Sequence, residues 1–302
     1  MTIKLAGLYP PITIPFNRNE DIVYTELENN VKKWVSQPLD GIVVPGSNSE
    51  AVHLTWEERI QIWRVCALIL KEKGKYFIAG VGGDATRQAI NMLHKAGELG
   101  ADAALMLPPY FYKPALSHEV LTGHFQKAAD ESPIPLLLYN VPVFTGVDFS
   151  LQTLLELAEH PNIIGMKDSS SNVVKSAQLI AKRPDFQVFA GTGSALLPFL
   201  SLGAVGGIMA LANFAALPLR KLYDAFKAGE MDNARKLQLS LAEINTAVTS
   251  RFGVPGLKYC MTQTGFYGGP PRRPLMVVPD SVQKELDSLL KSLQLNNDES
   301  DV

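Results

Sequence analysis

The 302-residue sequence contains few cysteines, no excess of charge of either sign and no long apolar run. Its two cysteines, Cys66 and Cys260, cannot build a disulfide framework, and their apolar surroundings are typical of reduced thiols that pack in a core. A formal net charge of -2 offers nucleic acid or a membrane surface no electrostatic attraction. No run approaches the roughly 18 apolar residues of a membrane span, and residues 1–9 lack the pattern of a signal peptide. We therefore expect a cytoplasmic protein whose partner is a small molecule, with no nucleic acid and no membrane.

The sequence also lacks the spacings that mark metal and nucleotide sites. No histidine pair with a glutamate has helical spacing, no cysteines cluster, and no G-x-S-x-G motif indicates a serine hydrolase. The glycine turn at residues 80–83 has neither a dinucleotide nor a Walker spacing. The five histidines, expected at the surface or at helix ends, are His53, His94, His118, His124 and His160. We predict no metal and no cofactor.

Short apolar runs alternate with longer amphipathic ones about eight times before residue 230. This alternation is typical of βα units around a parallel sheet. The expected strands are 6–14, 41–45, 76–79, 103–107, 135–139, 163–167, 187–190 and 207–210. Eight strands in this length predict an α/β fold, a (β/α)8 TIM barrel. A doubly wound six-stranded sheet is the second possibility, but its phosphate fingerprint is missing.

The helices and the C-terminal part follow from the same pattern. Helices are expected at 21–37, 56–71, 85–99, 118–130, 151–159, 173–181 and 217–228. After Gly229 three helical stretches occur without strands, at 233–250, 254–265 and 282–293. We therefore expect a barrel over residues 1–230, a helical extension packed on it over 231–295, and a frayed acidic tail over 296–302.

Barrel enzymes place their active sites at the carboxyl ends of the strands, and Lys167 is the only lysine at an expected strand end. It follows the apolar residues Ile163 and Ile164, so its amine would emerge from a dry interior into the barrel mouth. Desolvation disfavours the charged ammonium and provides the neutral amine that attacks a carbonyl. The plainer interpretation is a lysine that reaches solvent or pairs with Asp168.

Other strand ends supply polar groups. Tyr139 could carry protons between an imine and a substrate hydroxyl, or it could be an ordinary half-buried aromatic. Ser47 and Asn48 lie in a turn that could hold a carboxylate, although turn chemistry explains their presence equally well. The loop at residues 191–194 could bind phosphate, but no basic residue lies beside it.

Taken together, four motifs resemble the pyruvate-dependent class I aldolase family, which includes dihydrodipicolinate synthase, N-acetylneuraminate lyase and 4-hydroxy-2-oxoglutarate aldolase. They are PITIPF at 11–16, GSNSE at 46–50, LYNVP at 138–142 and IIGMKD at 163–168. The resemblance implies that Lys167 forms a Schiff base with a 2-oxo acid and that Tyr139 is the proton shuttle. It also implies four substrate-binding residues, which are Ser47, Asn48, Ser169 and Ile208.

Within the family, two likenesses leave the aldehyde half of the substrate open. The segments at 46–48, 166–169, 204–207 and 251–258 look like 4-hydroxy-2-oxoglutarate aldolase, whereas EAVHL at 50–54 and PRRPL at 271–275 look like fungal 2-keto-3-deoxy-sugar-acid aldolases. Both imply a metal-independent lyase that releases pyruvate and an aldehyde. The alternatives are a synthase-like condensation of pyruvate with an aldehyde and a non-catalytic pyruvate-binding relative. The resemblance further implies a homo-oligomer, either a dimer or a dimer of dimers.

Three departures from the family pattern bear on these alternatives. Phe144 stands where dihydrodipicolinate synthases have an arginine for the second substrate's carboxylate, and a phenyl ring cannot form that bidentate pair. Phe111 lacks the hydroxyl of a tyrosine that relays protons across the dimer, for which Tyr110 or Tyr112 is the candidate substitute. Ser49 replaces a glycine and would be strained if that position needs a positive φ.

Overall fold

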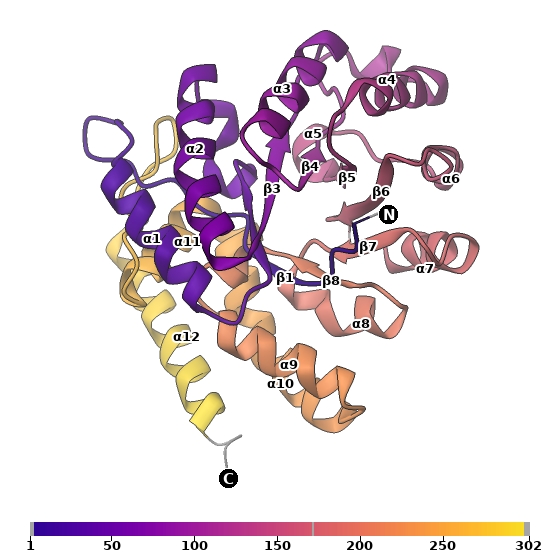
Figure 1. Ribbon diagram of the computed structural model, residues 1–302. Helices are drawn as coiled ribbons and strands as arrows, with labels where there is room; N and C mark the ends of the chain where they lie inside the picture. The colour runs from indigo at the N-terminus through magenta and orange to yellow at the C-terminus, as the bar shows by residue number, and fades with distance from the viewer. Residues whose placement is uncertain (1–2, 171, 299–302) are drawn as a thin grey trace.

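The computed structural model describes residues 3–170 and 172–298 and contains one sheet of eight parallel strands. The strand order is β1-β8-β7-β6-β5-β4-β3-β2, and helices surround the sheet (Figure 1). The strands are β1 (Gly7–Tyr9), β2 (Gly41–Val44), β3 (Tyr76–Val81), β4 (Ala103–Met106), β5 (Leu136–Asn140), β6 (Ile163–Asp168), β7 (Gln187–Ala190) and β8 (Gly206–Ile208). The predicted (β/α)8 barrel is confirmed.

The seam between β1 and β2 is closed by the residues that follow β1. Pro10 and Pro11 have no N–H to donate to a ladder, so β1 ends at Tyr9, well before the expected end at residue 14. Beyond β1, the Ile12 N–H donates to the Val43 carbonyl at 3.0 Å, and the Val43 N–H donates to the Pro10 carbonyl at 2.9 Å. The barrel is therefore closed by two hydrogen bonds that flank a bridge.

The helices of the barrel follow the amphipathic stretches closely. They are α1 (Tyr24–Ser36), α2 (Trp56–Lys73), α3 (Thr86–Glu98), α4 (His118–Glu131), α5 (Pro142–Thr145), α6 (Leu151–Leu157), α7 (Val173–Lys182), α8 (Leu196–Ser201) and α9 (Ala216–Lys227). The sequence reasoning missed α5 and α8, because helices of four and six residues are too short to show a period of 3.6.

Alternate residues of the strands enter two different cores. Leu137 and Tyr139 of β5 belong to a cluster inside the barrel, whereas Leu136 and Leu138 belong to the larger cluster between strands and helices. This follows from the period of two along a strand. Tyr139 therefore points into the barrel.

The C-terminal part packs on the barrel as three helices, along the left and the bottom of Figure 1. They are α10 (Met231–Thr246), continued by a short π-helix (Ala247–Arg251), α11 (Gly253–Gln263) and α12 (Asp280–Asp298). Leu241, Leu257 and Leu286 belong to the same large core cluster as the barrel helices. Helix α12 includes residues 296–298 of the expected frayed tail, and residues 299–302 lie outside the described residues. Within the described part, no helix has both the length and the apolar character that crossing a membrane requires.

Candidate active site

Lys167 and Tyr139 lie side by side inside the barrel. They are paired residues of the adjacent strands β6 and β5, so their side chains leave the sheet on the same face. The side chains are almost fully buried, with 4% and 5% of their surface exposed. The Lys167 Nζ lies 4.1 Å from the centroid of the Tyr139 ring. The structure thus brings together an amine and a phenol in a largely water-free setting.

The Tyr139 hydroxyl is surrounded by donors. Burial alone raises its pKa, but the Lys167 ammonium and hydrogen bonds from Ser47, Lys167 and Ser169 outweigh burial, so the pKa of Tyr139 is lowered. The Ser47 Oγ lies 3.4 Å from the Tyr139 hydroxyl. A phenol with a lowered pKa gives up its proton more readily than an ordinary tyrosine.

The other expected site residues come from three different loops or strands. Asn48 follows Ser47 in the 3-10 turn η1 (Ser47–Ser49), directly after β2. Ser169 follows β6, donates its N–H to the Asn140 carbonyl at 2.8 Å, and its Oγ packs against Gly191, where a Cβ would clash with it. Ile208 ends β8 and belongs with Tyr139 to the interior cluster. Ser47 and Ser169 therefore approach the Tyr139 hydroxyl from two sides of the barrel mouth.

Asp168 does not take the role of a partner for Lys167. Its carboxylate accepts hydrogen bonds from the Asn140 amide at 3.0 Å, the Ser170 N–H at 2.9 Å and the Ser176 hydroxyl at 2.8 Å. The side chains of consecutive strand residues point to opposite faces, so Asp168 faces the helices while Lys167 faces the interior. The sequence reasoning missed this network, which ties the end of β6 to β5 and α7.

The loop at residues 191–194 is occupied by the C-terminal extension. The Asn245 side chain of α10 accepts a hydrogen bond from the Gly193 N–H at 3.1 Å and donates to the hydroxyls of Thr192 and Ser194 at 2.8 and 2.7 Å. A phosphate bound at this loop would need the same N–H and hydroxyl groups as hydrogen-bond donors. The loop after β7 is therefore a contact between the barrel and the extension.

The three residues that depart from the family pattern differ in burial: Ser49 is buried, whereas Phe111 and Phe144 are exposed. Ser49 is buried and does not adopt a positive φ; the left-handed residue is its neighbour Glu50, with φ 56°. The Ser49 hydroxyl instead bonds to the Ile12 carbonyl and accepts from the Gly46 N–H at 2.9 Å, so the strain considered for Ser49 does not occur there. Phe111 and Phe144 are both exposed, at 71% and 68% of their surface.

A buried ion pair between Glu50 and Lys258, also missed, lies behind the η1 turn, and the Arg272 N–H donates to the same carboxylate. The available signal was a lysine within the apolar helical stretch at 257–261, because a lysine is almost never fully buried unless it is paired.

Cys66 and Cys260 are free and buried, and burial raises the pKa of Cys66 and raises that of Cys260 to about 12. Neither thiol is therefore poised to ionise near neutral pH. Across residues 3–170 and 172–298, no group of three or more His, Cys, Asp or Glu side chains could hold a metal ion.

Comparison with known proteins supports the resemblance seen in the motifs. The sequence profile of the Dihydrodipicolinate synthetase family matches residues 4–293. A 4-hydroxy-tetrahydrodipicolinate synthase of Thermosynechococcus vestitus is 34% identical over 93% of this chain and 95% of its own length. A protein of Emericella nidulans named "Probable 4-hydroxy-2-oxoglutarate aldolase, mitochondrial" is 35% identical over 92% of this chain and 91% of its own length.

The solved structures agree with this assignment. The 4-hydroxy-tetrahydrodipicolinate synthase of Methylacidiphilum fumariolicum superposes with a TM-score of 0.92 and 29% identity, covering 98% of each chain. The family profile spans the strands that carry Lys167 and Tyr139 as well as most of the C-terminal extension. The chain therefore belongs to the dihydrodipicolinate synthetase family of pyruvate-dependent lyases.

Proposed function

We propose that the protein is a class I aldolase that cleaves a 4-hydroxy-2-oxo acid to pyruvate and an aldehyde. The observation that carries this proposal is the placement of the Lys167 amine 4.1 Å from the Tyr139 ring in a buried site. Such a pair supplies both a nucleophile for a 2-oxo carbonyl and a proton carrier for the bond cleavage.

In the proposed reaction, Lys167 adds to the C2 carbonyl of the substrate and loses water to form an imine. Tyr139, as the phenolate, then removes the proton of the C4 hydroxyl, the C3–C4 bond breaks, and its electron pair passes into the imine to give an enamine. The aldehyde leaves, Tyr139 passes the proton it has taken up to C3 of the enamine, and water hydrolyses the imine to release pyruvate and free Lys167. Ser47 and Asn48 hold the substrate carboxylate, with Ser169 and Ile208 lining the same site.

Two likenesses give two candidates for the aldehyde half of the substrate. The Emericella nidulans relative is named for 4-hydroxy-2-oxoglutarate, which would yield glyoxylate. The fungal motifs at 50–54 and 271–275 favour a 2-keto-3-deoxy sugar acid. Condensation of pyruvate with an aldehyde is the second candidate, favoured by the name of the Thermosynechococcus vestitus relative. Phe144 argues against dihydrodipicolinate synthesis itself, since its ring offers no charged donor where those synthases hold the carboxylate of their second substrate.

Borohydride trapping tests the covalent step. Incubation with pyruvate and borohydride should add one reduced pyruvyl group, and peptide mass spectrometry should place it on Lys167. The matched variant Tyr139→Phe should still be trapped, because it keeps the lysine, while kcat for cleavage falls by about 100-fold or more. Turnover by a protein with an unmodified Lys167 would contradict the mechanism.

A panel of 4-hydroxy-2-oxo acids separates the candidate reactions. Release of pyruvate from one of them supports the lyase. Trapping without cleavage or condensation would instead favour the non-catalytic pyruvate binder, and condensation of pyruvate with an added aldehyde, without cleavage of any acid of the panel, would favour the synthase.

The cellular compartment and the oligomeric state of the protein are further parts of the proposal. The two free, buried thiols are compatible with a reducing compartment, so we place the protein in the cytoplasm. A homo-oligomer, either a dimer or a dimer of dimers, is supported by the exposed aromatic pair Phe111 and Tyr112, whose rings lie 5.0 Å apart.

A further inference from the structure

Glu50 lies directly behind the turn that carries Ser47 and Asn48. It is the residue that ends η1, it adopts the left-handed conformation with φ 56° and ψ 40°, and it is 2% exposed. A non-glycine residue holds this conformation only where its surroundings impose it. Here the surroundings are a cation and a backbone donor from the C-terminal extension.

Both carboxylate oxygens of Glu50 are engaged by that extension. One oxygen lies 2.6 Å from the Nζ of Lys258 in α11, and the other accepts the Arg272 N–H at 2.7 Å. We call Glu50, Lys258 and Arg272 the clasp. It joins a residue adjacent to the substrate turn to residues more than 200 positions later in the chain.

The cation in the clasp is costly to bury. Lys258 is 1% exposed, and burial lowers its pKa to about 8 although the Glu50 carboxylate opposes this. Its Nζ also donates to the Pro270 carbonyl at 2.9 Å and lies 4.4 Å from the centroid of the Phe16 ring. A well-packed apolar pair could replace such a buried ion pair at little cost in stability, so stability alone does not account for it.

Arg272 fixes the other side of the clasp. Its guanidinium forms a bidentate pair with Glu58 of α2 at 2.7 and 2.9 Å and donates to the carbonyls of His53 and Glu20. The guanidinium also lies 4.3 Å from the centroid of the Phe16 ring. The Arg272 side chain thus bonds to the chain both before the η1 turn, at Glu20, and after it, at His53.

The η1 turn (Ser47–Ser49) connects the clasp to the Tyr139 hydroxyl. The Glu50 N–H donates to the Ser47 carbonyl at 3.1 Å, and the Ser47 Oγ lies 3.4 Å from the Tyr139 hydroxyl. A displacement of Glu50 would therefore move Ser47 relative to Tyr139.

We infer that the clasp positions Ser47 and Asn48 for the carboxylate of the 2-oxo acid, so that the C-terminal extension takes part in substrate binding. Glu50, Lys258 and Arg272 are positioning residues in this inference, which rests on the proposed function. A purely structural ion pair would affect the melting temperature without affecting the affinity for pyruvate.

The double variant Glu50→Gln/Lys258→Met separates these two roles, because it removes both buried charges together. The measurement is the pyruvate concentration that gives half-maximal borohydride trapping, with the melting temperature recorded in parallel. We expect a melting temperature near that of the wild type and a half-saturating concentration raised about tenfold. The control Glu285→Gln removes an exposed ion pair with Arg251 in the same extension and should leave both values unchanged.

A folded double variant with wild-type half-saturation would overturn the inference while the proposed function stands. Absence of trapping in the wild type would contradict the proposed function and the inference with it. If the double variant does not fold, Glu50→Asp replaces it, since the shorter side chain keeps the charge but cannot reach Lys258 equally well. Its half-saturation should rise about threefold. An unchanged value in folded Glu50→Asp would equally overturn the inference.

Discussion

His124 is a buried histidine of α4 without a charged partner. One ring nitrogen lies 2.8 Å from the Thr86 hydroxyl, while within the described chain the other is buried with no hydrogen-bond partner. Burial lowers the pKa of His124 to about 4, and the Asp84 carboxylate opposes this only weakly. The folded state therefore keeps the imidazole neutral at pH values where the unfolded chain protonates it.

This imidazole should make the free energy of unfolding depend on pH. The unfolded state binds the extra proton between pH of about 6.5 and 4, so stability is lost as the pH falls through this range. From pH 7 to 4.5 the contribution of His124 amounts to roughly 2 to 3 kcal/mol. Urea unfolding of His124→Gln should lack that part of the loss, whereas His94→Gln, at an exposed position, should keep it. Equal pH dependence in both variants would show that His124 is not responsible.

The proximity of Lys167 and Tyr139 could be predicted because strand ends in a barrel converge. Lys167 and Tyr139 are adjacent on paired strands, as their positions at the ends of two successive strands required. The residues that hold them were not predictable in this way. Asp168, Ser176 and Asn140 meet only after the chain has folded, and Lys258 meets Glu50 from 208 positions away. Hydrophobic period and turn composition carry no information on such pairs.

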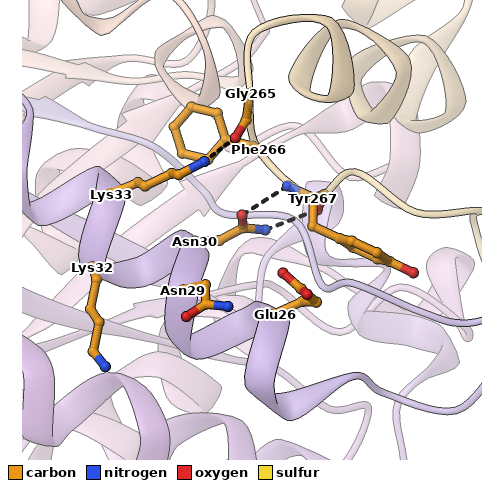
Figure 2. Close-up of a pocket in the computed structure, with 8 residues that line it drawn as sticks. All are labelled: Glu26, Asn29, Asn30, Lys32, Lys33, Gly265, Phe266 and Tyr267. Atoms are coloured by element: carbon orange, nitrogen blue, oxygen red, sulfur yellow. Dashed lines mark hydrogen bonds between the residues drawn. The ribbon is translucent and has the colours of Figure 1, made fainter.

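At the scale of elements, Asn30 of α1 forms a pair of hydrogen bonds with the loop between α11 and α12. The Asn30 amide donates to the Tyr267 carbonyl at 2.9 Å and accepts from the Tyr267 N–H at 3.0 Å (Figure 2). The Lys33 ammonium donates to the Gly265 carbonyl beside it, as Figure 2 also shows. The Asn30 amide thus satisfies both the N–H and the carbonyl of Tyr267, as the backbone of a neighbouring strand would.

Replacing Asn30 with alanine should therefore loosen the extension. Two hydrogen bonds are lost and both backbone groups of Tyr267 lose their partner, so we expect a loss of about 1 to 3 kcal/mol in the free energy of unfolding. Asn29→Ala is the matched control, because Asn29 is the adjacent, exposed residue of the same helix and should change stability by less than about 0.5 kcal/mol. Chemical denaturation of the two variants measures the difference, and equal stabilities would contradict the role given to Asn30.

Elements were predictable from the sequence where their own residues decide them. Helix α2 begins at Trp56, as expected, because Thr55 and Glu58 form a capping box in which each side chain bonds to the other's backbone. The end of β1 was misplaced because the apolar run 6–14 continues past the two prolines. The loop joining α11 to α12 has no period of its own, and its position depends on contacts such as Asn30 to Tyr267.

For the whole molecule, the barrel and the extension share one core. Trp34 of α1 stacks on Phe266 beyond α11 with ring centroids 5.3 Å apart, and Leu257 and Leu286 belong to the cluster that contains the barrel helices. The extension has no cluster of its own among the described residues, so it lacks a core that could survive separation from the barrel.

The two cysteines can test this view because one lies in each part. Cys66 is in α2 and Cys260 is in α11, and both are free and fully buried. If the extension and the barrel unfold together, both thiols become reactive over the same range of urea concentration. Alkylation at increasing urea, followed by peptide mass spectrometry, should give coincident midpoints that also match the loss of the far-UV circular dichroism signal. Alkylation of Cys260 at distinctly lower urea than Cys66 would show instead that the extension detaches first, and the clasp would then be absent while the barrel is still folded.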